Sequence, residues 1–369
     1  MIKEHKPRAK RYTRLDQPPN FQITPRIVRV LKIICNHPLI RVDQIALLAP
    51  DIPYDSLKTI IFNLFHAGLI AKPIQQAELH NSVPGSLSMF VSPDRLGYLL
   101  YSLFFADPLP TPKYTQENDR GKWNYIKHQH TTATTAMQYQ LAAQPMPGLT
   151  HLTQSDLWLK YAPTNRLNNP RYNPEDFPRL MSHDFLADPS EYMAVRSEVV
   201  PLKLKTRIEW DIKLPGNSHL TSITMPVSTE PDEYSGYTYN NRTRFTFHES
   251  DEGTETILPN ATIRQSMQLF FDTSLYQKLL VYIAAFRHRA HLTQFGITSF
   301  DVEITTSTPT RADNIIRQLG PLLLRQFHIH PNFVRLTDRQ TIAHFDSNPY
   351  HPDLRRKNLE GQELSLLKN

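Results

Sequence analysis

Hydrophobic positions in the first hundred residues predict three short helices. Apolar side chains in residues 27–34 recur at the spacing of a helix face, behind Thr24 as N-cap and Pro25 at the first helical position. Residues 42–48 predict a second helix, and residues 57–65 a third that ends at Gly68 in the C′ position. A strand near residues 89–91 returns beside residues 69–71. The pattern is typical of a winged helix-turn-helix over residues 21–106.

The third of these helices supplies candidate DNA contacts. Residues 64–70 resemble the end of the recognition helix in many winged-helix DNA-binding proteins. That resemblance implies that the outer face of the helix enters the major groove. The candidate contacts on this face are Ser56, Lys58, Thr59 and Asn63. The alternative is that this unit packs against another protein.

Periodicity in the second half of the chain predicts a mixed α/β domain. Alternating positions indicate strands at 199–212 and 222–227, and a hairpin of residues 237–239 and 243–249 around Asn240 and Asn241. Next come a helix at 274–291, a strand at 299–306, a helix at 311–326 and a strand at 328–336. Strands that alternate with helices imply parallel pairing with right-handed crossovers.

These segments divide the chain into a basic flexible arm (1–20), the winged helix-turn-helix DNA-binding domain (21–106), a proline-rich linker (107–122), an α/β domain (123–345) and a polar tail (346–369). The α/β domain starts with a helix at 123–143. Residues 145–190, where prolines are frequent and periodicity is poor, are expected to form a loop-rich cap.

Charge is concentrated at the N-terminus. Residues 1–72 hold 12 Lys and Arg against 5 Asp and Glu, whereas the whole chain has a net charge of +6. A basic arm beside a small helical unit indicates nucleic-acid binding, so Lys10, Arg11 and Arg14 join the candidate DNA contacts. A solvated tail is the alternative.

Composition restricts the class of protein. The only cysteine, Cys35, lies in a helix-patterned apolar run, so we expect no disulfide framework and a cytoplasmic location. The basic N-terminus leads into polar residues, which argues against a signal peptide, and the longest apolar run, 96–106, is too short to span a bilayer. The chain has no glycine motif for phosphate binding, so we expect no nucleotide cofactor.

Acidic residues near the middle of the α/β domain form the strongest candidate site. The alternation that carries Phe245 and Phe247 continues into Glu249 and Asp251, which therefore lie on one face of a strand. Asp232 follows Pro231 at an earlier strand end. Three carboxylates at one point would suit Mg²⁺ better than zinc.

Several motifs resemble the replication-relaxation family of plasmid, phage and integrative-element proteins, over roughly residues 21–336. They are Phe-x-Ile-Thr-x-Arg at 21–26, a single His128 on a helix, the Pro-Asp pair at 231–232, Glu-x-Asp-x-Gly-Thr-Glu at 249–255, Lys-Leu-x-x-Tyr at 278–282, and the strand at 302–307 followed by Arg311. The resemblance implies a DNA-binding protein of a mobile element that acts in replication or DNA transfer.

The same residues resemble, more distantly, the restriction-endonuclease-like core. In that core a Pro-Asp pair and an acid-x-Lys motif on the next strand hold Mg²⁺ and a water. Asp232 and Glu249 match the first two positions, whereas Asp251 stands where lysine is expected. Lys278 on the following helix is the substitute this implies, with Tyr282 one turn later on its face.

The sequence is compatible with three functions of the C-terminal domain. It could be a degenerate nuclease-like domain, an active Mg²⁺-dependent endonuclease, or a non-enzymatic assembly module. A further alternative is a tyrosine relaxase, in which His328 and His330 bind a metal and Tyr276 or Tyr282 attacks DNA. His128 and His130 diverge on a helix and are not expected to share a metal. The expected partners are double-stranded DNA and other replication or transfer proteins, with a homodimer left open and no membrane contact.

Overall fold

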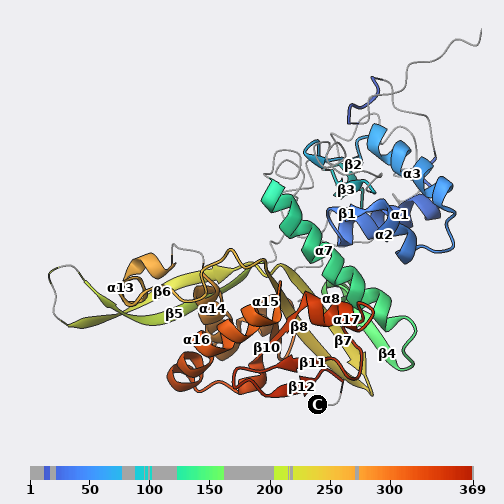
Figure 1. The fold of residues 1–369 in the computed structure, drawn as a ribbon. Coiled ribbons are helices and arrows are strands. Elements are labelled where there is room, and N and C mark those ends of the chain that lie inside the picture. Colours follow the sequence, from blue (N-terminus) through green and yellow to red (C-terminus); the bar gives the residue numbers. More distant parts are fainter. Residues whose placement is uncertain are drawn as a thin grey trace, which may run out of the picture. The chain divides into compact units, whose positions relative to one another are not determined.

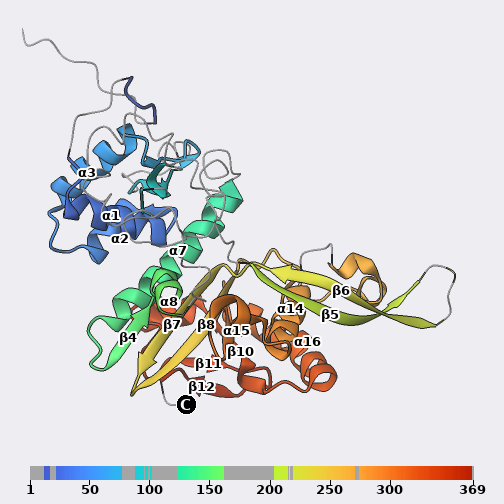
Figure 2. The same cartoon turned by 180° about the vertical axis from the view of Figure 1, so that it is seen from behind.

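The computed structural model divides the chain into two compact units (Figures 1 and 2). Unit 1 comprises Met1–Met137 and Leu167–Val200, and unit 2 comprises Gln138–Arg166 and Pro201–Asn369. The structure describes residues 12–16, 22–76, 88–94, 96–98, 100–101, 123–161, 203–214, 216, 219–270 and 274–367. No helix in these ranges is long and apolar enough to cross a membrane.

Unit 1 has the three predicted helices, α1 (Pro25–Asn36), α2 (Val42–Leu48) and α3 (Tyr54–His66). The hydroxyl of Thr24 caps α1, and Gly68 after α3 has a φ of 78°, which only glycine adopts without strain. Strands β1 (Ile40–Arg41), β2 (Ile70–Ala71) and β3 (Phe90–Pro93) form an antiparallel sheet in the order β1-β3-β2. The apolar faces of the helices supply the buried core of this unit.

Unit 2 is built on a mixed sheet with the order β12-β11-β10-β9-β8-β7-β4. The strands are β4 (Leu149–Leu152), β7 (Glu233–Tyr239), β8 (Arg242–Asp251), β9 (Asp301–Thr306), β10 (Val334–Asp338), β11 (Arg355–Lys357) and β12 (Glu363–Ser365). The predicted hairpin is confirmed, with Asn240 and Asn241 at positive φ in its turn. The predicted parallel pairing is confirmed for β8, β9 and β10.

Residues 346–369, which we expected to be a polar tail, instead provide β11 and β12 at one edge of this sheet. Arg356 is one of several charged residues in this segment, but its side chain is fully buried in an ion pair with Glu303. Charge in the sequence therefore concealed a core position. Strand β10, which we expected at residues 328–336, begins only at Val334, because Pro331 starts the short 3-10 turn η4 (Pro331–Phe333).

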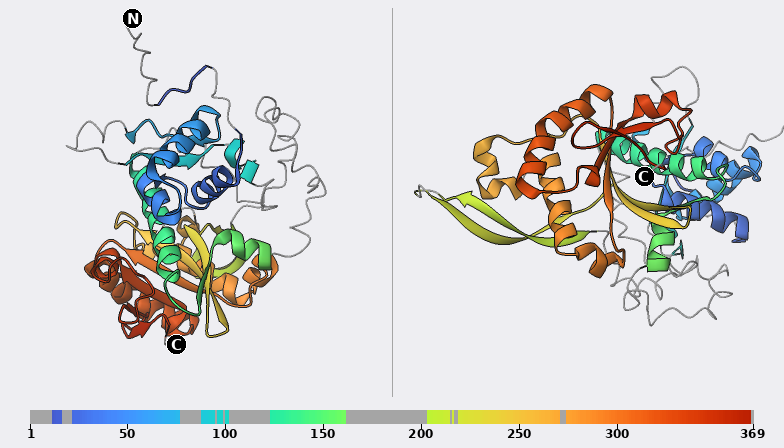
Figure 3. Two further views of the ribbon diagram at one scale, coloured as in Figure 1. Left: turned by 90° about the vertical axis from the view of Figure 1, so that its right-hand side faces the viewer. Right: turned by 90° about the horizontal axis from the view of Figure 1, so that it is seen from below.

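Helices cover both faces of the sheet. One face packs against α14 (Leu275–Arg287), where the Tyr282 ring stacks on Phe247 of β8, and against α16 (Pro309–Phe327), whose Arg311 bonds Asp251. The short helix α15 (Ala290–Phe295) follows α14. The face opposite α14 packs against the last turns of α7 (Trp123–Ala143), through Tyr139 and His248. Helix α8 (Gln154–Tyr161) lies along β7, and α17 (Arg339–His344) follows β10 (Figure 3).

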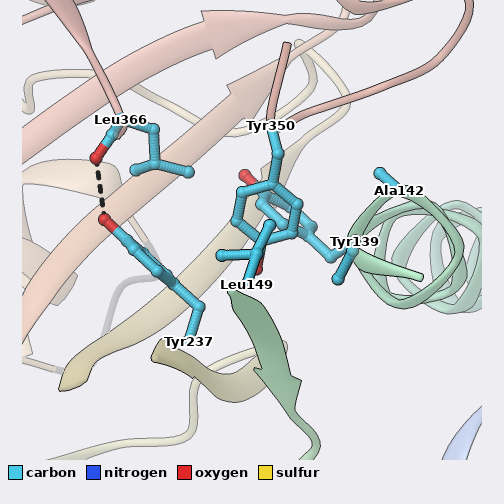
Figure 4. Packing of buried hydrophobic residues seen from close by; sticks show 7 residues of the cluster. Tyr139, Ala142, Leu149, Tyr237, Tyr350 and Leu366 are labelled. Carbon is cyan, nitrogen blue, oxygen red and sulfur yellow. Dashed lines mark hydrogen bonds between the residues drawn. The ribbon is translucent and has the colours of Figure 1, made fainter. Parts of the chain in front are cut away.

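Figure 4 shows an aromatic cluster on the face covered by α7. Here the hydroxyl of Tyr237 donates to the backbone carbonyl of Leu366, at 2.8 Å. The cluster is formed by Tyr139, Ala142, Ala143, Leu149, Tyr237, Tyr350 and Leu366. It connects the end of α7 to the C-terminal strands.

A separate two-stranded sheet precedes β7. Strands β5 (Leu204–Lys213) and β6 (Leu220–Thr229) form a long twisted hairpin that projects beyond the seven-stranded sheet (Figures 1 and 3). Its base packs against α14, and Trp210 donates to the carbonyl of Arg264 in α13 (Ala261–Arg264) and contacts Phe270 in η3 (Met267–Phe270).

Candidate functional site

The predicted acid cluster lies at one end of the central strands of the main sheet. β8 and β9 end there, and β7 begins there because it is antiparallel to β8. Helix α14 begins at the same end of the sheet, capped by the hydroxyl of Ser274. This placement follows the rule that sites in α/β sheets form beyond the carboxyl ends of parallel strands.

Glu249 and Lys278 are brought together, as the sequence suggested. The ammonium of Lys278 donates to Oε2 of Glu249 at 3.0 Å, and the hydroxyl of Tyr282 donates to Oε1 at 2.5 Å. The Glu249 side chain is 2% exposed, whereas that of Lys278 is 25% exposed. Lys278 and Tyr282 therefore approach the carboxylate from one helix face, as four-residue spacing requires.

Asp232 and Glu255 complete the negative side of the site. One carboxylate oxygen of Asp232 accepts from the backbone N–H of Ser250 at 2.7 Å, which fixes it beside β8. The carboxylate of Glu255 lies 3.3 Å from the ammonium of Lys278. Lys278 is thus shared among acids that outnumber it.

The pKa values of the site reflect this imbalance. Burial raises the pKa of Glu249 to about 7, with help from Asp232 and against the attraction of Lys278. Burial also raises the pKa of Glu255. For Lys278, burial opposes ionisation, but Glu249, Asp232 and Glu255 outweigh it and raise the pKa above its ordinary value. The cation is therefore held firmly, and Glu249 titrates near neutrality.

Asp251 is buried on the same face of β8 but has a different partner. Nε and Nη2 of Arg311 donate to its two oxygens at 2.7 and 3.1 Å, and Nη2 also donates to the carbonyl of Glu255. A bidentate pair of this kind satisfies the carboxylate. Glu252, next along the chain, is bonded in the same way by Arg339.

Two of the three carboxylates predicted to bind a metal, those of Glu249 and Asp251, are therefore bonded to other side chains. Among the described residues, no group of three or more His, Cys, Asp or Glu side chains is arranged to hold a metal ion. Both oxygens of Glu249 are taken by Lys278 and Tyr282, and both oxygens of Asp251 by Arg311. In this arrangement the ammonium of Lys278 stands beside the acids where a divalent cation would be expected.

Sequence reasoning gave no role to Arg311, Arg339 or Glu255. Glu255 was visible in the acidic motif, but its position beside Lys278 depends on the turn after β8. Arg311 lies 60 residues from Asp251 in sequence, at the start of another helix, and nothing local connects the two.

The candidate DNA contacts on α3 are placed on its outer side. Lys58 and Thr59 are exposed, and Ser56 and Asn63 are half-buried. The Lys58 ammonium bonds Asp55 at 3.0 Å and lies 4.6 Å from the centre of the Tyr54 ring. Its charge is therefore partly neutralised within the helix.

Arg14, assigned to a flexible arm, is fixed against the folded part of unit 1. It pairs with Asp94 and donates to the carbonyls of Phe65 and Ile70. These bonds connect the segment before α1 to the end of α3. Lys10 and Arg11 lie outside the described residues.

The histidines and tyrosines of the relaxase alternative are not arranged as that mechanism requires. His328 ends α16 in the left-handed conformation, and His330 caps η4 by accepting from the N–H of Asn332, so the two do not share a strand. The hydroxyl of Tyr276 donates to Gln326, and that of Tyr282 to Glu249. In unit 1, Nδ1 of His130 contacts the carbonyl of Leu39 at 3.0 Å.

Comparison with known proteins finds no matching family model, no matching curated protein and no matching solved structure.

Proposed function

We propose that the protein binds duplex DNA through unit 1, as a winged helix-turn-helix, and that unit 2 is a restriction-endonuclease-like core. The observation that carries the assignment of unit 2 is the grouping of Asp232, Glu249 and Lys278 at one end of the strands of its sheet. An acid after a proline at the start of one strand, with a second acid on the next strand, is the arrangement that this core implies. The mobile-element role in replication or transfer rests on the motif resemblance.

Unit 1 supports DNA binding through its architecture and charge. Three helices and a small antiparallel sheet, whose first strand lies between α1 and α2, leave the polar face of α3 exposed. The excess of Lys and Arg in residues 1–72 provides the attraction to phosphates. Phosphate contacts position the protein, and side chains such as Asn63 would read base edges.

The contacts of the acid cluster in unit 2 favour a protein that binds DNA without cleaving it. Lys278 and Arg311 occupy the carboxylates that a metal would use, so no reaction step is assigned to a metal here. Asp232 and Glu255 still leave the site with more negative than positive charge. That excess favours a second candidate function, a divalent-metal-dependent endonuclease in which an added cation relieves the repulsion.

The test is a gel assay of the full chain on labelled linear and supercoiled duplex DNA, with and without Mg²⁺ or Mn²⁺. We expect binding that weakens steeply with salt and no cleavage. Lys58→Ala should weaken binding and reduce the salt slope by about 1. The matched control is Lys205→Ala, which removes an exposed lysine of unit 2.

Other outcomes decide between the alternatives. Absence of binding, or binding that ignores salt, would contradict the proposal. Metal-dependent cleavage that disappears in Glu249→Gln and persists in Asp313→Asn would establish the endonuclease instead. A covalent protein–DNA adduct that Tyr276→Phe or Tyr282→Phe abolishes would establish the relaxase.

A further inference from the structure

Strand β6 differs from its hairpin partner β5 in having no charged residue. Its residues, Leu220–Thr229, include no Lys, Arg, Asp or Glu. Strand β5, its hairpin partner, has a charged side chain at 205, 207, 209, 211 and 213. Proteins normally protect a long exposed edge with charges, because an unprotected edge pairs with another strand.

The direction of the backbone groups follows from the contacts of β5. Both the N–H and the carbonyl of Lys205 bond the side chain of Gln294, so they point away from β6. Lys205 is therefore in a non-hydrogen-bonded pair with Ser228, and pair types alternate along the ladder. The pairs of Ser222 with Asp211 and Thr224 with Glu209 are of the same type. Ser222 and Thr224 thus direct their N–H and carbonyl groups to the open edge of β6.

The open edge is also accessible. Leu220 is 53% exposed, and Ser222, Thr224 and Pro226 are exposed. In the described residues, no hydrogen bond reaches the outward backbone groups of Ser222 or Thr224. Pro226 has no N–H and fits only where a strand lacks a partner on that side, so the edge can pair along residues 220–224.

We propose that this edge pairs antiparallel with the same edge of a second copy of the chain. A two-fold register centred on Ser222 places Leu220 opposite Thr224 of the partner and keeps Pro226 outside the ladder. An isologous contact of this type places no like charges opposite each other, and Ser and Thr pairs across strands are favourable. The result is a four-stranded sheet, β5-β6-β6-β5, which is more stable than an isolated hairpin. DNA is a poor occupant because the edge has no cation.

The experiment is cysteine cross-linking of the full chain at the predicted two-fold axis. In Ser222→Cys, the two Cα atoms would lie about 5.5 Å apart, within the range of a disulfide. We expect rapid formation of a cross-linked dimer under mild oxidation. The control is Glu209→Cys, which is on the same exposed face but on β5, away from the axis. The native Cys35 is buried and should not react.

Sedimentation measurements give an independent readout. The unmodified chain should show a concentration-dependent dimer, and Ser222→Lys, which places two ammonium groups opposite each other, should be a monomer. Glu209→Lys should remain dimeric. Fluorescence of Trp210, in a background where the other two tryptophans are replaced by Phe, checks that the hairpin is folded. Thr224→Pro, which removes an outward N–H, replaces Ser222→Lys if that variant unfolds. A monomer at every concentration, or equal cross-linking at 222 and 209, would overturn the proposal.

Discussion

Two buried glutamates on neighbouring strands of one sheet have opposite pKa shifts. Glu249 of β8 lies on the face covered by α14, and Glu303 of β9 lies on the face covered by α7; each side chain is at most 2% exposed. Burial raises the pKa of Glu249 to about 7. Burial acts on Glu303 in the same direction, but Arg356 and Arg335 outweigh it and lower the pKa to about 2.

The difference arises from the number of charges around each carboxylate. Glu303 bonds Nε of Arg356 at 2.9 Å and also accepts from the hydroxyl of Tyr139, with Arg335 nearby. Glu249 shares one ammonium with Glu255 and Asp232. Burial alone therefore does not decide ionisation in this sheet. The network around Glu303, in which cations balance the carboxylate, is buried and structural; we call it the matched, sealed network. The network around Glu249, in which carboxylates outnumber the cation, reaches solvent at Lys278 and has the properties of a functional site.

The largest effect is expected from breaking the matched network. Arg356→Met should reduce the free energy of unfolding by about 3–5 kcal/mol, because it leaves the Glu303 carboxylate buried without its main cation. Urea unfolding at pH 7 measures this. The control is Lys357→Met at the next position, where an exposed pair with Asp313 should contribute only about 0–1 kcal/mol. Equal losses in the two variants would contradict the distinction between the buried Arg356–Glu303 pair and the exposed Lys357–Asp313 pair.

The same contrast explains what the sequence could predict. Periodicity predicted the three helices of unit 1 and the hairpin at Asn240, because each depends on a local pattern, and the order of strands and helices along the chain predicted the parallel pairing. Strand alternation placed Glu249 and Asp251 on one face, and the four-residue helix spacing placed Lys278 and Tyr282 on another, but the pairing of Glu249 with Lys278 was expected only from the resemblance to the restriction-endonuclease-like core. The DNA-binding and nuclease assignments remain predictions, because they depend on partners.

Ion pairs between residues far apart in the chain could not be predicted from the sequence. Arg356 appeared to be a surface charge in a polar tail, because its partner Glu303 lies 53 residues earlier on another strand. Asp251 appeared to be a metal ligand for the same reason, since only the folded chain brings Arg311 to it. A charged residue is informative about a site only when its counter-charge is also known.

The second prediction uses pH to separate the two faces. Burial, with Arg335 and Arg356, lowers the pKa of His248 to about 4 although Glu303 opposes this. Its folded pKa is below the unfolded value, so stability should rise between pH 4 and 6.5, by up to about 3 kcal/mol. The pKa of Glu249 is raised, so its contribution should be present below pH 4.5 and lost as pH rises to about 7.

Urea unfolding of the wild type, His248→Gln and Glu249→Gln from pH 4 to 8 tests these signs. Relative to the wild type, His248→Gln should lose most stability at high pH, and Glu249→Gln should lose most at low pH. Tyr276→Phe, which removes a hydroxyl that donates to the uncharged Gln326, should run parallel to the wild type. Curves of the same slope for the first two variants would contradict the contrast between the faces.

The smallest effect concerns the hydroxyl that bonds Glu249. Tyr282→Phe removes the 2.5 Å hydrogen bond to this carboxylate. A bond to an ionised acceptor contributes more than one to a neutral acceptor, about 1.5–3 against 0.5–1.5 kcal/mol. The loss should therefore be larger at pH 8, where Glu249 is ionised, than at pH 5. Tyr276→Phe is the matched control from the same helix, because its hydroxyl donates to the uncharged Gln326 at 3.3 Å and its loss should not vary with pH. If Tyr282→Phe also lost the same stability at both pH values, Glu249 would not change its ionisation in this range, and the site would resemble the sealed network.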